Sequence, residues 1–420
     1  MDDELFLKVG SVDITPLRPI PLAGLFDRTD PYSTIADKLE ANAVLLRDDK
    51  QKVIIVSTDL FFIGKTLRNG ILDKIKDIVS DQELFISASH SHFTPATDDS
   101  KPLLGKVDSE YLSLVIANIS GLIRELVTGK AERVSLLYSV GSNSSSNINR
   151  RRFAWAGFLT LRKEMEMMPN AKGYKDPSIR MIKVVDQNNN IIAILWNYCC
   201  HPTGFNNLTR VSAEYPGFVR KKLREELRSD IPVLFLQGFS GDVRPNVILK
   251  APKKKTSSAY ITFLVSRLHN GQRFGNFFDS EWNEWAQSLA DSVIEVVRRK
   301  NDECVKARLE NKRATIEPEA IGLTMAGGPV SFHRIDIGDI RIIGISAETV
   351  AEYLPLLENA FPDSKIIPVS YLDHVLGYLP TNNMLSEGGY EVNGFQKYFS
   401  VKADFPPDLQ ERIVSAIRSL

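Results

Sequence analysis

Short apolar runs that face each other across polar turns are the feature that most constrains the fold of this chain. Ala43 to Arg47 and Val53 to Ser57 are rich in β-forming side chains and flank Asp48-Asp49-Lys50. Apolar runs separated by a few polar residues are typical of β-hairpins. The sequence therefore predicts antiparallel strand pairs. Three such hairpins are expected, at residues 43–57, 181–198 and 334–345.

Helical stretches lie between these hairpins. Ser109 to Val127, for example, carries apolar residues at helical spacing. Because strands mix with helices and several connections are hairpins, the sequence predicts an α/β fold of layered mixed β-sheets flanked by helices. No internal repeat or low-complexity linker interrupts residues 1–420, so we expect a single domain. The four main predicted helices are 66–79, 109–127, 214–227 and 281–299.

Composition excludes some classes of protein. The 420 residues contain 52 Lys plus Arg and 52 Asp plus Glu, a balance that argues against a general nucleic-acid-binding surface. No run of 18 apolar residues occurs, so we expect no membrane span. The acidic start, MDDELFLKVG, lacks the pattern of a signal peptide, and we expect a cytoplasmic protein. Cys199, Cys200 and Cys304 are expected to be free thiols. The oligomeric state is not specified.

Histidines follow two of the predicted strands. His90 and His92, in SASHSHFTP, come directly after Leu84 to Ala88, and His201, in CCHPTG, comes after the strand that ends at Tyr198. Residues i and i+2 of an extended chain point to the same side. Neutral imidazole is a good zinc ligand. A metal site is therefore one interpretation of these histidines, and a polar loop with structural histidines is the other.

Three further polar clusters are candidates for a site. LQGFSGDVRPN places Asp242 and Arg244 after an apolar strand, although a tight turn with an exposed ion pair would explain them equally well. Glu348, in ISAETV, follows another strand and is expected at the start of a helix, where it could ligate a metal or complement the helix dipole. Tyr378 and Tyr390 are expected in loops.

Taken in order, these motifs resemble the neutral, non-lysosomal ceramidase family over most of the chain, from VGSVDITP to about Phe399. The opening VGxxDIT element, the HxH pair, an Asn-Arg motif at Asn149-Arg150 and an HP element at His201 are all similar to those of the family. GDVRPN, AET and the elements around Tyr378 and Tyr390 follow in the same order.

The resemblance implies a zinc-dependent amidohydrolase. One Zn²⁺ per chain would be held by His90, His201, Glu348 and Tyr378. The side chains implied around the substrate amide are those of His92, Arg150 and Tyr390, with Asp242 and Arg244 as further candidates for substrate binding. A zinc ion with an open position lowers the pKa of its water to about 7, and Tyr390 could donate a hydrogen bond to the developing oxyanion.

Two departures from the family suggest a different substrate. Arg244 stands where the family has a serine, and the C-terminal immunoglobulin-like domain of the family is expected to be missing because the sequence ends at Leu420. A guanidinium favours bidentate binding of a carboxylate or phosphate. We therefore expect a small, anionic N-acyl substrate rather than a neutral lipid. A metal-dependent ester or phosphoester hydrolase and a non-catalytic metal-binding protein remain the alternatives.

Overall fold

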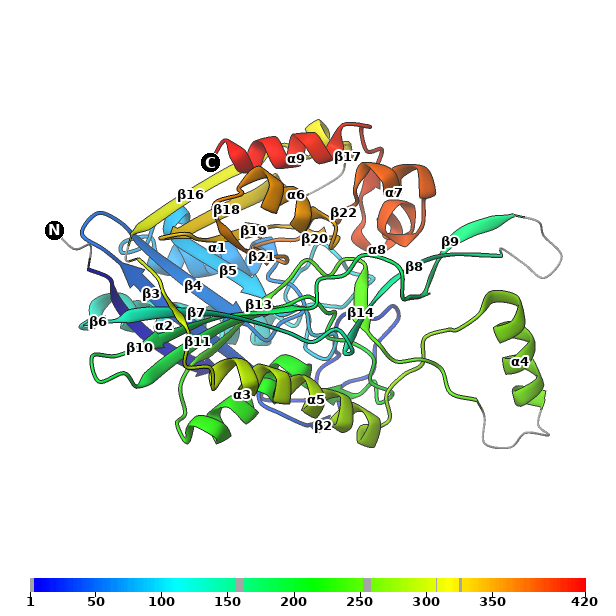
Figure 1. The fold of residues 1–420 in the computed structure, drawn as a ribbon, viewed down its shortest axis with the longest axis horizontal. Coiled ribbons are helices and arrows are strands. Elements are labelled where there is room, and N and C mark those ends of the chain that lie inside the picture. Colours follow the sequence, from blue (N-terminus) through cyan, green and yellow to red (C-terminus); the bar gives the residue numbers. More distant parts are fainter. Residues whose placement is uncertain (1–3, 156–161, 252–257, 307, 325–326) are drawn as a thin grey trace.

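The computed structural model describes residues 4–155, 162–251, 258–306, 308–324 and 327–420. Three sheets form its body, and each combines antiparallel and parallel strand pairs (Figure 1). The first sheet has the strand order β5-β4-β3-β1-β6, in which β4 and β5 run parallel and the other neighbours antiparallel. Its strands are β1 (Phe6–Asp13), β3 (Glu40–Arg47), β4 (Lys52–Thr58), β5 (Leu84–Ala88) and β6 (Glu132–Arg133).

The second and third sheets repeat this arrangement, because each contains one parallel pair. β11 runs parallel to β13 in the second sheet, which has the order β13-β11-β10-β7-β15, and β19 runs parallel to β21 in the third, which has the order β16-β18-β19-β21. The second sheet consists of β7 (Ser135–Ser142), β10 (Ser178–Val185), β11 (Ile191–Tyr198), β13 (Val233–Gln237) and β15 (Glu303–Cys304). The third consists of β16 (Leu309–Ile316), β18 (Val330–Ile337), β19 (Ile340–Ile345) and β21 (Lys365–Val369).

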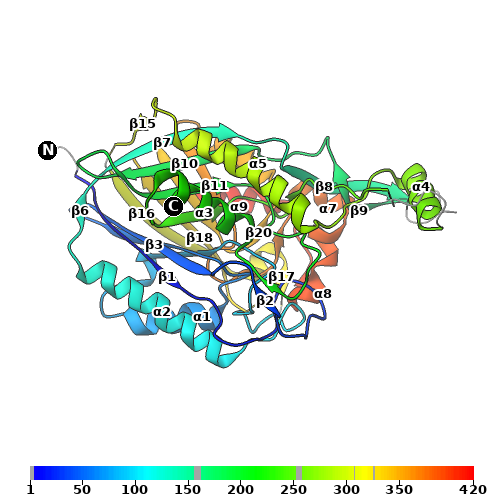
Figure 2. The same cartoon turned by 90° about the horizontal axis from the view of Figure 1, so that it is seen from below.

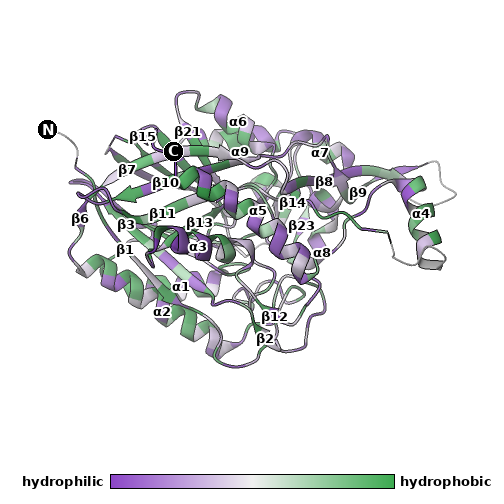
Figure 3. Cartoon of the chain, turned by 60° about the horizontal axis from the view of Figure 1, so that its bottom comes forward, coloured by the Kyte–Doolittle hydropathy of each residue, from purple (hydrophilic) through white to green (hydrophobic). Residues whose placement is uncertain are grey.

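Alternation along the strands divides the core into layers. Val53 and Ile55 of β4 belong to the apolar cluster shared by all three sheets, whereas Ile54 and Val56 belong to the cluster beneath helices α1 and α2. Successive strand residues point to opposite faces, so both faces of this sheet are covered. Figures 2 and 3 show α1 and α2 on one side of the body and α3 and α5 on another. The main helices are α1 (Lys65–Ile75), α2 (Ser109–Thr128), α3 (Glu214–Leu227), α5 (Asp279–Val297), α6 (Tyr353–Ala360) and α9 (Leu409–Arg418).

Smaller elements lie beside the ends of the main strands. Figure 1 shows the β8–β9 hairpin and α4 extending away from the body at one end. β14 pairs with β8, and the two-residue strands β20 and β22 pair with each other in parallel. These elements are β8 (Asn147–Trp155), β9 (Lys163–Asn170), β14 (Val243–Pro245), α4 (Ser258–Asn270), β20 (Glu348–Thr349), β22 (Tyr378–Leu379), α7 (Asn382–Glu387), the π-helix η3 (Tyr390–Gly394) and α8 (Gln396–Phe399). The remaining pairs are β2 (Thr34–Ile35) with β12 (Arg210–Val211), and β17 (Leu323–Thr324) with β23 (Lys402–Ala403).

The predicted fold class is confirmed, and the three predicted hairpins are β3–β4, β10–β11 and β18–β19. Two local predictions are wrong. Tyr378 and Tyr390 are not in loops, because Tyr378 lies on β22 and Tyr390 begins the π-helix η3. Glu348 does not begin a helix, because it lies on β20 and α6 begins five residues later, at Tyr353. The helix-dipole explanation of this carboxylate therefore fails.

Helix α2 is long and apolar enough to cross a membrane by length and composition alone. Its buried residues include Tyr111, Val115 and Ile119, which belong to the cluster that α1 and the first sheet share. An apolar face packed in this way is also what a core helix requires.

Candidate metal centre

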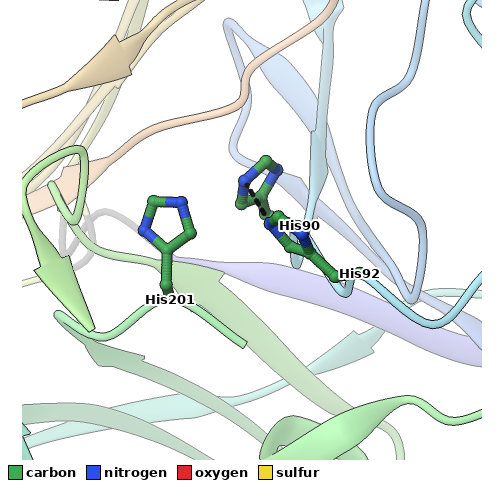
Figure 4. Close-up of side chains that lie close together, drawn as sticks. All are labelled: His90, His92 and His201. Atoms are coloured by element: carbon green, nitrogen blue, oxygen red, sulfur yellow. Dashed lines mark hydrogen bonds between the residues drawn. The ribbon is translucent and has the colours of Figure 1, made fainter. Parts of the chain in front are cut away.

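The three histidines that follow the strands come together in space. Ring nitrogens of His90, His92 and His201, one from each residue, all lie within 4.8 Å of one another (Figure 4). His90 and His92 follow β5, and His201 follows β11. The two strands belong to different sheets, and the segments that follow their carboxyl ends bring these side chains to the same region. The sequence prediction that these histidines converge is met by this geometry.

The backbone at His90 differs from the extended chain that we expected. His90 has φ 66°, which is the left-handed region that few side chains adopt. Its ring nevertheless meets His92, with 3.2 Å between the two Nε2 atoms. Aromatic rings hold His90 in place: Tyr371 stacks on it at 4.0 Å between ring centroids, and Phe61 stacks at 4.5 Å. Packing therefore fixes this histidine in a conformation that strand periodicity does not predict.

Backbone carbonyls orient two of the histidines. His90 Nδ1 lies 3.1 Å from the Phe61 carbonyl oxygen, and His201 Nδ1 lies 2.7 Å from that of Ser240. Burial lowers the pKa values of both rings well below the usual range of histidine, so both are neutral at pH 7. A neutral ring that donates from Nδ1 presents the lone pair of Nε2. A histidine that binds a metal through Nε2 must be in this tautomer, with its proton on Nδ1.

Glu348 lies where these two lone pairs point. Its Oε2 atom is 3.6 Å from His90 Nε2 and 3.4 Å from His201 Nε2, and all three side chains are 1–2% exposed. Both Nε2 lone pairs and the Glu348 carboxylate are acceptors gathered around one point, which a divalent cation would bind. The donor set of two imidazoles and one carboxylate is one that zinc accepts. The residues present thus fit a metal ion.

Strand pairing places Tyr378 next to this group. In the parallel pair β20–β22, Glu348 and Tyr378 are direct partners in the register. Gly241 allows the chain after β13 to approach the same strand, since a Cβ atom there would lie 2.7 Å from the Glu348 carbonyl oxygen. The structure therefore brings the four predicted ligands, His90, His201, Glu348 and Tyr378, together.

Arg150 lies beside the two predicted tyrosines. Its Nη2 atom donates to Tyr378 Oη at 3.1 Å, and its guanidinium lies 5.6 Å from the centre of the Tyr390 ring. Burial opposes the charge of Arg150, but Tyr378 and Glu391 outweigh this effect and raise its pKa well above the usual value. Arg150 thus stays cationic beside both phenols.

Two residues of this centre, Glu391 and Tyr371, had no role predicted from the sequence, although Glu391 belongs to the Gly389-Tyr390-Glu391 element that resembles the family. Glu391 accepts hydrogen bonds from Arg150 at 2.8 Å and from Arg151 at 2.6 Å, across about 240 residues of chain. Burial acts to raise the pKa of Glu391, but the two guanidinium groups lower it below its usual value. Tyr371 donates to Glu348 Oε2 at 3.2 Å in addition to stacking on His90. Tyr371 therefore contacts two of the predicted metal ligands, Glu348 and His90.

Asp242 holds three segments of the centre together. Its carboxylate accepts hydrogen bonds from Asn149 Nδ2 at 2.7 Å and from the Ala351 amide at 2.8 Å, and its carbonyl oxygen accepts from the Arg150 amide. Burial raises the pKa of Asp242 to about 6. Both carboxylate oxygens of Asp242 already have protein partners, which favours a positioning role for this residue. The predicted direct contact between Asp242 and the substrate stays a prediction.

Arg244 lies on β14 without a carboxylate partner among the residues that the structure describes. Its guanidinium carbon lies 4.4 Å from the centre of the Phe274 ring, and its Nε atom is buried with no hydrogen-bond partner. Burial lowers the pKa of Arg244 to about 10. The alternative of a surface ion pair between Arg244 and Asp242 does not describe this geometry, because Asp242 is bound elsewhere.

Comparison with known proteins identifies the family. Residues 6–310 match the family model described as neutral/alkaline non-lysosomal ceramidase, N-terminal. The chain belongs to the neutral/alkaline non-lysosomal ceramidase family. His90, Arg150, His201 and Arg244 fall within the matched span of this ceramidase model, whereas Glu348, Tyr378 and Tyr390 follow it.

The curated ceramidases that this chain matches are longer proteins. It is 24% identical over 324 residues to neutral ceramidase of Drosophila melanogaster, a match that covers 70% of this chain and 44% of the fly protein. The neutral ceramidase of Drosophila pseudoobscura pseudoobscura matches with the same identity and coverage. The chain thus spans less than half the length of these relatives.

Solved ceramidase structures share the fold. The crystal structure of neutral ceramidase from Pseudomonas aeruginosa superposes with a TM-score of 0.73 at 14% identity, covering 100% of this chain and 74% of that one. A structure described as ceramidase complexed with C2 gives a TM-score of 0.71 at 14% identity, covering 99% and 74%. At this identity the likeness establishes the layered fold of the body.

Proposed function

We propose that this protein is a zinc-dependent hydrolase that cleaves the amide bond of a small, anionic N-acyl substrate. The observation that carries the proposal is the convergence of His90 Nε2 and His201 Nε2 on Glu348, with both Nδ1 atoms held by backbone carbonyls. Membership of the ceramidase family supports amide hydrolysis, because neutral ceramidases act on a carbon–nitrogen bond.

The four ligands of the proposed site are His90, His201, Glu348 and Tyr378. Zinc bound there would acidify a water molecule and polarise the substrate carbonyl. His92 is proposed to take up or release a proton, because its Nε2 atom lies 3.2 Å from that of His90. Burial lowers the pKa of His92 well below its usual range, so its ring begins the reaction as a neutral base.

Arg150 and Tyr390 are proposed to position and stabilise the reacting amide. Arg150 is fixed by Glu391 and donates to Tyr378, which orients that phenol toward the centre. Tyr390 packs edge-on against Tyr378 with 5.5 Å between ring centroids, so its hydroxyl can donate to a developing oxyanion near this ring. One such donor typically contributes roughly 3 kcal/mol to transition-state stabilisation.

Arg244 is the reason for proposing an anionic substrate. Arg244 is partly buried, its Nε atom is fully buried, and it has no carboxylate partner among the described residues, so the loss of hydration of its charge is not repaid within the protein. A carboxylate or phosphate of the substrate would supply that partner. Ceramide, which is neutral, would not.

The test is to identify products from zinc-loaded protein. The purified protein is incubated with a panel of anionic N-acyl amino acids, a ceramide, and matched carboxylate and phosphate esters, and the products are resolved by mass spectrometry. Release of amine and carboxylate from an anionic amide, lost in His92→Gln while zinc content stays the same, would support the proposal. Turnover of the esters alone would favour the esterase alternative, and no turnover with bound zinc would favour a binding protein.

A further inference from the structure

Buried arginines in this protein are, as a rule, paired with carboxylates. Arg68 pairs with Asp373, Arg180 with Asp176 and Arg220 with Asp59. The pairing of Arg150 and Arg151 with Glu391 follows the same pattern. This matches the general rule that a charge withdrawn from water needs a partner of opposite charge. An arginine that departs from the pattern near the proposed active site therefore requires an explanation.

Arg28 departs from this pattern beside His92. Its Nη1 atom donates to the carbonyl oxygens of His92 at 2.7 Å and Ala23 at 3.0 Å. Its Nε and Nη2 atoms are buried and have no hydrogen-bond partner, and no carboxylate among the described residues forms an ion pair with it. The guanidinium also lies 5.2 Å from the centre of the Phe93 ring. Arg28 is thus a fixed cation beside the centre, with two buried donors that have no partner inside the protein.

The backbone before Arg28 passes close to His92. Gly24 has φ 92°, and a Cβ atom there would lie 2.9 Å from the Cα atom and the ring of His92. The carbonyl oxygen of Thr94 accepts a hydrogen bond from the Ala23 amide. A loop from the N-terminal part of the chain is therefore tied to the His92 segment, and Arg28 is held there by the structure around it.

Arg28 and Arg244 have similar surroundings, but Arg28 is next to His92 and Arg244 is next to the His201 segment. Each rests on a phenylalanine ring, each has a buried Nε atom without a partner, and each lacks a carboxylate among the described residues. Arg28 donates to the backbone carbonyl of His92, whereas Arg244 follows Val243, whose carbonyl oxygen accepts a hydrogen bond from the His201 amide. The rings of His92 and His201 are 5.7 Å apart between centroids. A substrate amide bound between them would have one cation near each of its two ends.

We infer that Arg28 is a second anion-binding residue and that the substrate carries a negative group on both the acyl part and the amine part of its amide. The inference rests on the proposed hydrolytic function and names the substrate class of that same site. Each guanidinium would form charge-assisted hydrogen bonds with one of the two anions. Neutral lipid amides are disfavoured because they would leave both cations unpaired.

Four matched compounds test this inference. N-succinyl-alanine is anionic on both sides of its amide, N-acetyl-alanine only on the amine side, N-succinyl-alaninamide only on the acyl side, and N-acetyl-alaninamide on neither. For the wild type we expect kcat/KM to be highest for the first compound. If Arg28 binds the acyl-side anion, Arg28→Gln should lower kcat/KM about ten-fold for the two succinyl compounds; if it binds the amine-side anion, the loss should fall on the two compounds with a free alanine carboxylate. In either case kcat/KM for the other two compounds should change less than about two-fold. Arg28→Lys should recover part of the loss.

A binding measurement separates this inference from the proposed function. Calorimetric titration of zinc-free protein with N-succinyl-alanine requires no turnover, and Arg28→Gln should weaken binding about ten-fold. The matched control is Arg341→Gln, since Arg341 also stacks on a phenylalanine but is paired with Asp336. Weaker binding in Arg28→Gln with no hydrolysis by the wild type would refute the proposed function and keep the anion site. Unchanged binding in Arg28→Gln, or an equal loss for all four compounds, would overturn the inference.

Discussion

Glu348 and Tyr378 face each other as direct partners in the short parallel pair β20–β22. Glu348 Oε2 lies within 3.6 Å of His90 Nε2 and His201 Nε2, and Tyr378 accepts a hydrogen bond from Arg150. Two residues of one strand pair thus contact the histidine group and the buried arginine. A pairing of this kind sets the distance between the proposed ligands through backbone hydrogen bonds, which hold it more firmly than flexible loops would.

The first prediction is that the protein binds about one zinc ion per chain and that His201→Ala weakens binding sharply. The substitution removes one ligand of a small set, and the remaining donors cannot replace it. Metal analysis and zinc titration of the purified proteins measure the effect. His374→Ala is the control, because His374 is not part of the histidine group. Equal zinc affinity in His201→Ala and wild type would point to another ligand set.

The second prediction concerns the stability of the zinc-free protein at low pH. Burial holds the pKa values of His90, His92 and His201 well below 6.5 in the folded state, whereas an unfolded histidine titrates near 6.5. Below about pH 6.5 the unfolded state therefore binds more protons, and stability falls as the pH falls. Each histidine contributes up to about 1.4 kcal/mol per pH unit.

Urea unfolding of zinc-free protein at pH 7.5 and pH 5.5 measures this slope. His92→Gln removes one of the histidines whose pKa burial lowers, so its stability should depend less steeply on pH than that of the wild type. An unchanged slope in His92→Gln would mean that another group controls the acid sensitivity.

Much of the histidine group was predictable because its signals are local. An apolar run that ends in a polar residue marks a strand end, and His90, His201 and Glu348 each follow such a run. The position of Tyr371 was not predictable, since nothing in its neighbouring sequence distinguishes it. Glu391 follows Tyr390 in an element that resembles the family, but its pairing with Arg150 depends on a segment about 240 residues away. β8 was also missed, because NINRRRFAW has too many charged residues to indicate a strand. Arg150 and Arg151 are buried there only because Glu391 neutralises them from a distant segment.

The third prediction is that Glu391→Gln destabilises the fold and lowers activity. The substitution leaves Arg150 and Arg151 without their buried carboxylate, and breaking such a pair typically costs about 3–5 kcal/mol. Loss of the contact would also release Arg150 from Tyr378. Glu387→Gln is the control, because Glu387 pairs with Arg151 but is 35% exposed, and it should cost less than about 1 kcal/mol. Similar losses in both variants, measured by urea unfolding, would contradict this account.

The fourth prediction is that all three cysteines are free thiols but react differently. Cys199 and Cys200 are buried and Cys304 is exposed. Burial also raises the pKa values of Cys199 and Cys200 well above the usual value, which suppresses the reactive thiolate. Thiol titration should find about one fast site in the native, non-reduced protein and three after unfolding. Cys304→Ser should abolish the fast site, and fewer than three thiols after unfolding would reveal a disulfide.

The last prediction separates a substrate-binding role of Arg244 from a purely structural one. A bidentate contact between Arg244 and a substrate anion is worth about 1.5–3 kcal/mol, so Arg244→Ser should lower kcat/KM for an anionic N-acyl substrate roughly ten- to a hundred-fold. Zinc content should not change, because Arg244 is not one of the proposed ligands. Arg244→Lys keeps the charge but loses the planar fork, and it should recover only part of the activity.

A structural role would give a different pattern, because loss of the stacking on Phe274 would destabilise the protein without selecting among substrates. Assays of each variant with a neutral N-acyl substrate and with ceramide make the distinction. We expect Arg244→Ser to keep its activity on the neutral amide and to gain little on ceramide, because Arg28 still leaves an unpaired cation beside His92. A variant that loses activity equally on charged and neutral amides would show that Arg244 does not recognise the anion. Substantial ceramide hydrolysis by Arg244→Ser would show that this one residue separates the protein from the ceramidases that it resembles.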